Sequence, residues 1–126
     1  MKITSHRELV VWQRAMDLVV EVYRLSARFP GDERFRLTNQ LACAAASVPA
    51  NIAEGHARST AKEYSRFLAI AKGSLMETET FLMLAIRLDY VAEAQAGPAL
   101  AMVTQISKML TRLRARLGEA ASRPRD

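Results

Sequence analysis

The sequence predicts an all-α fold, an antiparallel up-down-up-down four-helix bundle in a single domain. Apolar residues recur at spacings of three and four along four long segments, which is the period of an amphipathic helix. The 126 residues include only five glycines and four prolines, too few for the frequent turns of an all-β protein. The breaks between the four segments are short, and short connections place successive helices side by side in opposite directions.

The first helix is predicted to begin at Ser5 and to end near Pro30. The Ser5 hydroxyl can cap this helix, and Glu8 three residues later completes a capping box. Pro30 disfavours helical backbone at the residue before it. The charged side chains of the segment crowd onto one face, which leaves two apolar stripes about 120° apart.

Two apolar stripes on one helix are more than a single bundle core needs. We therefore predict that one stripe lies in an oligomer interface, against another copy of the chain. The alternative is a wide helix sunk deep in a monomer. The stripe assigned to the oligomer interface contains Val11, Leu18, Val22, Leu25 and Phe29. The stripe assigned to the bundle core contains Leu9, Trp12, Met16, Val19 and Tyr23.

The second helix is predicted from about residue 32 to residue 57, with Pro49 in its interior. Pro49 removes the hydrogen bond to the carbonyl of Ala45 and is expected to kink the helix. The third helix is predicted to open at Thr60, because Thr60 and Glu63 form another capping-box pattern. Its expected inward stripe contains Phe67, Ile70, Ser74, Phe81, Leu84 and Leu88.

The fourth helix is predicted to begin between residues 92 and 99, where Gly97 and Pro98 fit a first turn. Its apolar stripe repeats at alternating spacings of three and four. The stripe contains Val103, Ile106, Leu110, Leu113 and Leu117. We place the four-helix bundle at residues 1–118 and predict a disordered basic C-terminal tail at residues 119–126.

Polar side chains follow one face of the second predicted helix and recur on the third. They are Gln40, Ser47, Asn51, Glu54, Arg58, Ser74 and Glu77. Ser47 and Asn51 flank Pro49 and can satisfy the backbone groups that the proline frees. We interpret the set as a structural polar network that fixes the register of the two helices. A ligand site or a catalytic site in the same network stays open as an alternative.

The net charge of +5 is concentrated near the C-terminus. Residues 108–126 hold six basic and two acidic side chains, whereas residues 1–107 are nearly neutral. Lys108, Arg112 and Arg116 are spaced four apart, opposite the apolar stripe, with Arg114 toward the flank. We predict that these four cations bind the phosphate backbone of RNA or another nucleic acid. The alternative is a solvated face whose cations complement the helix dipole.

The sequence contains no recognisable motif for catalysis, metal binding or cofactor binding. Glu-x-x-His pairs, Gly-rich phosphate loops and nucleophile motifs do not occur. Cys43 is the only cysteine, which favours a reducing, cytoplasmic location, and its alanine neighbours predict a buried thiol. No segment has the composition of a signal peptide or of a membrane span. We therefore expect a protein that is not an enzyme, with no metal, no cofactor and no membrane.

Five stretches of the chain resemble signature sequences of the 23S rRNA intervening-sequence proteins, also called the four-helix-bundle protein family. They are residues 9–13 (LVVWQ), 37–41 (LTNQL), 47–55 (SVPANIAEG), 71–77 (AKGSLME) and 108–110 (KML). The resemblance implies an antiparallel four-helix bundle that assembles into a bacterial homopentamer, with no assigned catalytic residues. Ala42 and Cys43 depart from the basic residues often found at these positions, which weakens any RNA contact of the second helix.

The basic C-terminal end and the resemblance together predict the function. We expect a non-enzymatic, cytoplasmic homo-oligomer that acts as an RNA-associated accessory or scaffold protein. Its partners would be further copies of the chain and RNA or another nucleic acid. The alternative is a protein-protein interaction or assembly module with no nucleic-acid binding, whose basic ends are merely solvated.

Overall fold

The computed structural model describes the backbone of residues 5–122 and the side chains of residues 5–119. It contains the helices α1 (Val10–Ser26), α2 (Leu37–His56), α3 (Ala61–Arg87) and α4 (Glu93–Ser122). Short 3-10 turns, η1 (His6–Glu8) and η2 (Gly31–Glu33), precede α1 and α2. The described residues contain no β-strand, so the all-α prediction is confirmed. No described helix is long and apolar enough to cross a membrane.

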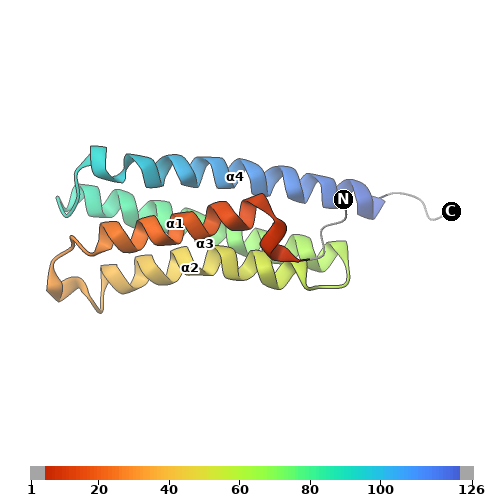
Figure 1. Cartoon of the computed structure of the whole chain (residues 1–126), viewed down its shortest axis with the longest axis horizontal. Helices are drawn as coiled ribbons and strands as arrows, with labels where there is room; N and C mark the ends of the chain where they lie inside the picture. The colour runs from red at the N-terminus through yellow and green to blue at the C-terminus, as the bar shows by residue number, and fades with distance from the viewer. Residues whose placement is uncertain (1–4, 123–126) are drawn as a thin grey trace.

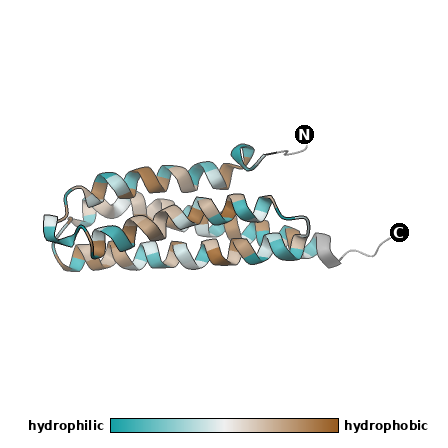
Figure 2. Ribbon diagram, turned by 90° about the horizontal axis from the view of Figure 1, so that it is seen from below, coloured by the Kyte–Doolittle hydropathy of each residue, from teal (hydrophilic) through white to brown (hydrophobic). Residues whose placement is uncertain are grey.

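The four helices lie side by side along one long axis, and the chain reverses direction at each connection (Figure 1). Each helix contacts the next one in the chain, and α1 also packs against α4. Hydrophobic and hydrophilic residues alternate along each helix (Figure 2), as expected for helices that bury one face. The fully buried large side chains include Leu18, Leu41, Leu75 and Ile106, one from each helix.

The first predicted helix is interrupted before α1 begins. Ser5 caps the short turn η1, where its hydroxyl accepts a hydrogen bond from the backbone N–H of Arg7 at 3.2 Å. Leu9 then adopts an extended backbone, with φ −76° and ψ 125°, and α1 starts at Val10. Ser5 therefore acts as a helix cap, but through the N–H of Arg7 and for a single turn that lies outside the long helix.

The predicted oligomer interface on α1 is wrong, because its residues form the core of the single chain. Their exposed fractions are Val11 5%, Leu18 0%, Val22 0%, Leu25 4% and Phe29 8%. The stripe assigned to the core is the more exposed one, with Met16 at 41% and Tyr23 at 57%. Periodicity detected both stripes correctly, but only packing against α2 and α4 decides which of them faces inward.

The inward face of α3 also differs from the prediction. Ile70, Leu84 and Leu88 are each more than 40% exposed, whereas Ser74 is buried as expected. The other buried residues of α3 are Leu68, Ala71, Leu75, Thr78, Leu82 and Ala85. Three fully buried leucines, Leu68, Leu75 and Leu82, alternate on this face with the smaller Ala71, Thr78 and Ala85, so the inward face is rotated from the predicted one.

The close approach of α2 and α3 depends on Gly55, which is buried near the end of α2. A Cβ atom at this position would lie 2.8 Å from the Cβ of Phe67 and 3.0 Å from Cδ1 of Tyr64. Contacts that short do not occur between real side chains, so any larger residue would push the two helices apart. The α2–α3 turn follows directly, and Thr60 caps α3 as predicted by accepting from the N–H of Glu63 at 3.1 Å.

The helix α4 begins at Glu93, within the predicted interval, but Pro98 lies in its interior rather than in its first turn. Val103, Ile106 and Leu110 are fully buried, and Leu113 and Leu117 pack half-buried against the core, which confirms the predicted stripe. The helix continues to Ser122, so residues 119–122 of the predicted disordered tail are helical. Residues 123–126 of the predicted tail lie outside the described residues.

Candidate nucleic-acid interface

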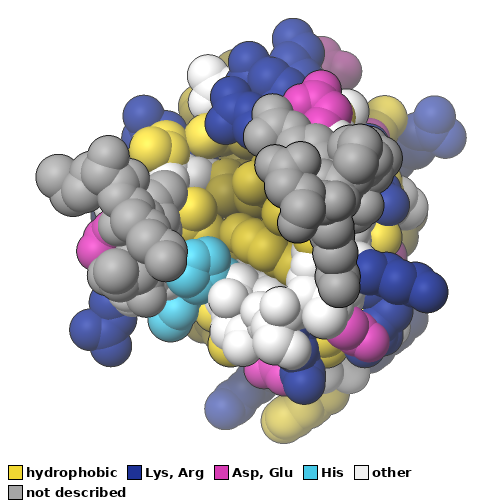
Figure 3. All heavy atoms as spheres, turned by 90° about the vertical axis from the view of Figure 1, so that its right-hand side faces the viewer, with side chains coloured by type: hydrophobic (Ala, Val, Ile, Leu, Met, Phe, Trp, Pro, Cys, Tyr) yellow, Lys and Arg dark blue, Asp and Glu magenta, His cyan; other side chains and the backbone are white. Residues whose placement is uncertain are grey.

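The charges of the described side chains are distributed unevenly between the two ends of the bundle. One end, which we call the basic end, is formed by the start of α1, the end of α2, the start of α3 and the end of α4. This half of the bundle, residues 5–17, 46–72 and 108–119, contains ten Lys and Arg against five Asp and Glu. The opposite half contains five Lys and Arg against seven Asp and Glu. Seen end-on, the basic end has cations around an apolar centre (Figure 3).

The four cations predicted for RNA binding, Lys108, Arg112, Arg114 and Arg116, are all exposed on α4. Within the described side chains, no ion pair joins any of them to a carboxylate. Arg114 donates from Nε to the hydroxyl of Ser65 on α3 at 3.3 Å. Their charges are therefore available to an anion arriving from solvent.

Lys72 belongs to the same basic surface, although the sequence did not identify it. Its Nζ donates a hydrogen bond to Oγ1 of Thr111 at 2.9 Å, across the contact between α3 and α4. Lys72 and Thr111 are 39 residues apart in the chain, and no local pattern could have paired them. Lys108 and Arg112 border a shallow depression beside Thr111, so Lys72 adds a cation next to two of the predicted ones.

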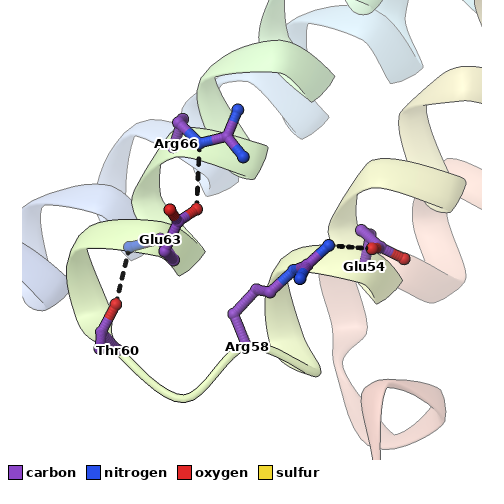
Figure 4. A network of polar contacts seen from close by, with 5 residues as sticks. All are labelled: Glu54, Arg58, Thr60, Glu63 and Arg66. Atoms are coloured by element: carbon purple, nitrogen blue, oxygen red, sulfur yellow. Dashed lines mark hydrogen bonds and ion pairs between the residues drawn. The ribbon is translucent and has the colours of Figure 1, made fainter.

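The cations of the α2–α3 turn are already engaged within the chain (Figure 4). Arg58 pairs with Glu54, and Arg66 pairs with Glu63 at 3.0 Å. Both guanidinium groups also lie over the ring of Phe67, at 4.8 Å for Arg58 and 4.5 Å for Arg66. Because carboxylates and the ring already hold these two arginines, they contribute less to an anion site than the α4 cations do.

The predicted polar network is only partly assembled. Ser74 donates from Oγ to Oγ of Ser47 at 2.9 Å and so links α3 to α2. The amide nitrogen of Asn51 donates to Oγ of Ser47 at 2.9 Å and to its carbonyl oxygen at 2.8 Å. Glu54 and Arg58 form their ion pair outside this network. The carbonyl of Ala45, which Pro49 frees, is not the acceptor that Asn51 uses.

Gln40 and Glu77 line an open depression of about 300 Å³ between α2 and α3, together with Ser47 and Ser74, but they join none of the network's hydrogen bonds among the described side chains. The same depression is lined by Cys43, which is exposed, so the predicted buried thiol is wrong. The Cys43 thiol lies 3.7 Å from Oδ1 of Asn39, a weak contact along the outer face of α2. No described group is placed there to activate a nucleophile, since neither a histidine nor a paired carboxylate lines the depression.

The described residues do not form a metal-binding site. No three His, Cys, Asp or Glu side chains among these residues lie close enough together to hold an ion. His56 instead makes an edge-on contact with the Tyr64 ring at 5.8 Å, and His6 makes one with Trp12 at 5.1 Å. Both histidines therefore pack against aromatic rings.

Sequence analysis missed a second polar cluster, at the end opposite the basic end. Glu33 is only 7% exposed, and its Oε2 accepts from the backbone N–H of Leu37 at 3.1 Å. Its Oε1 accepts from the hydroxyl of Tyr90 at 3.1 Å and lies 3.7 Å from the guanidinium of Arg36. Burial, together with the bond to Glu33 and the charge of Glu33, raises the pKa of Tyr90. An acid in the first turn of the predicted second helix was the only available signal.

Comparison with known proteins supports the resemblance noted in the sequence. Residues 7–112 match the family described as 23S rRNA-intervening sequence protein. A crystal structure from Bacteroides thetaiotaomicron, of a protein with unknown function from the S23 ribosomal protein family, is similar with a TM-score of 0.77. The two chains are 25% identical over 83% of this chain and 98% of that one. No curated protein matches the chain.

Proposed function

Because the chain belongs to the family of 23S rRNA-intervening sequence proteins, we propose that it is a non-enzymatic, RNA-associated accessory or scaffold protein. In this proposal the basic end binds RNA phosphates, and the opposite end stays free of nucleic acid. The chemistry is electrostatic, because lysine and arginine displace the counterions of the phosphate backbone. The protein works in the cytoplasm as a homo-oligomer.

The observation that carries the proposal is the row of cations along α4. Lys108, Arg112 and Arg116 follow one another at successive turns, about 6 Å apart along the helix axis. They are exposed and, within the described side chains, free of carboxylate partners. Two of the four predicted cations, Arg114 and Arg116, lie beyond the residues that match the family.

The apolar surface of α1 and α2 supports assembly into an oligomer. An apolar groove of about 330 Å³ lies between the two helices. It is lined by Trp12, Met16, Val19, Ala46, Pro49, Ala50 and Ala53. A second apolar surface, on α3, exposes Met83 at 48%, Leu84 at 42% and Leu88 at 46%. Two different complementary surfaces on one chain favour a closed ring, in agreement with the homopentamer that the family resemblance implies.

A ring would also multiply the charge of the basic ends. The antiparallel up-down-up-down arrangement, which the reversals in Figure 1 support, brings the start of α1 and the end of α4 to the same end of each protomer. Rotation about an axis parallel to the helices would then place every basic end on one face of the ring. Clustered positive charge strengthens RNA attachment and speeds its association.

RNA binding can be tested with a fluorescein-labelled RNA hairpin at about 50 and 200 mM salt, a range over which several phosphate contacts lose orders of magnitude in affinity. The Lys108→Ala/Arg112→Ala/Arg116→Ala variant should bind at least tenfold more weakly at the lower salt, with a shallower salt dependence. The matched control, Arg24→Ala/Arg28→Ala/Arg87→Ala, removes the same charge from the opposite end and should bind like the wild type.

The same experiment distinguishes RNA association from the alternative function, a protein-protein interaction or assembly module. A wild-type protein that assembles but binds no RNA at either salt concentration would contradict RNA association. It would then be an interaction or assembly module. Equal losses in the two triple variants would show that binding follows net charge alone and that the basic end is not the interface.

A further inference from the structure

An apolar pocket opens on the basic end, directly beside the cation row of α4. Its walls are Leu9, Val10 and Val11 from the start of α1, and Met109 and Leu113 from α4. The pocket has a volume of about 290 Å³. Figure 3 shows this end of the bundle with hydrophobic side chains at its centre and lysine and arginine side chains along part of its rim.

The pocket exists because α1 starts late. The backbone is extended at Leu9, so α1 cannot continue beyond Val10 to cover the last turns of α4. The apolar stripe of α4 nevertheless continues through Leu113 and Leu117, which remain half-buried. Because α1 does not extend over the last turns of α4, a gap lined by aliphatic side chains lies beside them.

Arg112 and Arg116 stand on the α4 side of the pocket. They are one helical turn apart, so an extended strand lying along α4 would bring neighbouring phosphates past both guanidinium groups. Glu8 lines the α1 side of the pocket. The pocket thus joins an apolar cavity to cations on one side only.

We propose that this pocket receives one unpaired nucleobase, while Arg112 and Arg116 hold the phosphates that flank it. The inference rests on the proposed function and narrows it: the partner is single-stranded or looped RNA rather than a continuous duplex. A base within a duplex is stacked and paired and cannot enter a cavity, whereas a loop base can turn outward. The volume lies at the lower limit of small-molecule pockets, which suits a single base.

Electrostatics alone predicts the opposite preference. A duplex carries more charge per unit length than a single strand, so a purely phosphate-binding surface favours the duplex or treats the two alike. A preference for unpaired RNA would therefore require a contact with the base itself. Such contacts tolerate different sequences, because every base has an apolar face.

The test uses three labelled RNA probes: a 12-nucleotide single strand, the same sequence as a duplex, and the single strand with abasic sites at alternate positions. Fluorescence anisotropy at one fixed salt concentration measures the three affinities. The wild type should bind the intact single strand about tenfold more tightly than either of the other probes, as expected for one base contact.

The pocket variant is Val10→Gln, which makes the pocket polar without changing charge or removing a fully buried side chain. Val10 is 52% exposed. The matched control is Val20→Gln on the same helix, where Val20 is 48% exposed and lies away from the pocket. Val10→Gln should reduce the preference for the intact single strand at least threefold and leave duplex affinity unchanged, and Val20→Gln should change neither.

The outcomes separate this inference from the function on which it rests. If no probe binds, the proposed function fails and the inference fails with it. If all three probes bind equally, RNA association stands and the base pocket is overturned. A single-strand preference that Val10→Gln leaves intact would also overturn the pocket, because the base would then be held elsewhere.

Discussion

The hydroxyl of Tyr90 donates a 3.1 Å hydrogen bond to Oε1 of the buried Glu33, and so joins the α1–α2 connection to the α3–α4 connection. Tyr90 reaches this position because Asp89, two residues after the end of α3, has a left-handed backbone with φ 59°. The N–H of Tyr90 then bonds to the carbonyl of Ala85 at 2.9 Å, which turns the chain sharply after the helix. Two loops that are distant in the sequence thus share one carboxylate at the end opposite the basic end.

Loss of the Tyr90 hydroxyl should destabilise this end of the bundle. Tyr90→Phe keeps the ring and its contact with Phe29 but leaves Oε1 of Glu33 without its phenol donor. A buried acceptor that loses its partner costs stability, and a decrease in thermal midpoint of about 4 °C is expected. Circular dichroism during heating measures the change. The control is Tyr23→Phe, whose ring is 57% exposed and whose midpoint should not move.

Stability should decrease at high pH through two tyrosines. Burial raises the pKa of Tyr64, and burial followed by the bond to Glu33 raises the pKa of Tyr90, from the usual value of 10.0. A raised pKa in the folded state means that the unfolded chain loses these protons first. The stabilisation is therefore complete below about pH 10 and is lost as the pH rises beyond it.

The Tyr64→Phe/Tyr90→Phe variant isolates this pH effect. Its thermal midpoint should decrease less than that of the wild type between about pH 9 and pH 11, because phenylalanine does not ionise. Parallel curves for the two proteins would show that other groups cause the alkaline loss. The Tyr64 hydroxyl is buried and has no hydrogen-bond partner among the described residues, so Tyr64→Phe alone should not destabilise the protein at neutral pH.

Gly55→Ala should be strongly destabilising, since the new Cβ would lie 2.8 Å from the Cβ of Phe67. Relieving this overlap requires α2 and α3 to move apart, at a cost of about 1–3 kcal/mol in the free energy of unfolding. Gly73→Ala is the matched control, because a Cβ there meets nothing within 4 Å. This control should gain about 0.5–1 kcal/mol through the higher helix propensity of alanine. Urea denaturation measures both changes.

Asn51→Leu should destabilise the protein by about 1 kcal/mol, through loss of the two bonds within α2 from its amide to Ser47. Ser47 retains its bond to Ser74, so the bundle should still fold. Gln40→Leu changes an exposed residue that sequence analysis placed in the same network but that joins none of its hydrogen bonds among the described side chains. It should stay within about 0.5 kcal/mol of the wild type. Equal effects of the two substitutions would contradict a structural role for Asn51.

Met16→Glu should weaken the proposed oligomer, because Met16 is 41% exposed and lines the apolar groove between α1 and α2. A carboxylate buried between subunits without a partner is costly, so the variant should sediment as a smaller species at micromolar concentration. Val20→Glu adds the same charge to the same helix, outside the groove, and should sediment like the wild type. A wild type that is itself monomeric would contradict the oligomer.

Local interactions explain the parts of the structure that sequence analysis predicted correctly. Thr60 caps α3 through an N–H only three residues away, and the stripe of α4 depends on the spacing of its own residues. The exposed cations of α4 follow from the same spacing, since they lie opposite that stripe. The family resemblance also depends on short local motifs, and the match over residues 7–112 confirms it.

The remaining features depend on residues far apart in the chain. Periodicity found two apolar stripes on α1, but their helical spacing is the same, and only the positions of α2 and α4 bury Val11 and Leu18 and expose Met16. The exposure of Cys43 likewise depends on how the helices pack. The hydrogen bonds from Lys72 to Thr111 and from Tyr90 to Glu33 join residues far apart in the chain.

The sequence by itself therefore determined the all-α class, the existence of the four helices, the α4 stripe and its cation row. The tertiary structure decided which faces are buried, where the apolar pocket opens and which polar groups meet. The physical reason is that helix formation and capping depend on neighbours within a few residues. Burial depends instead on how whole helices pack, and side-chain shape at contacts such as Gly55 and Phe67 sets that packing.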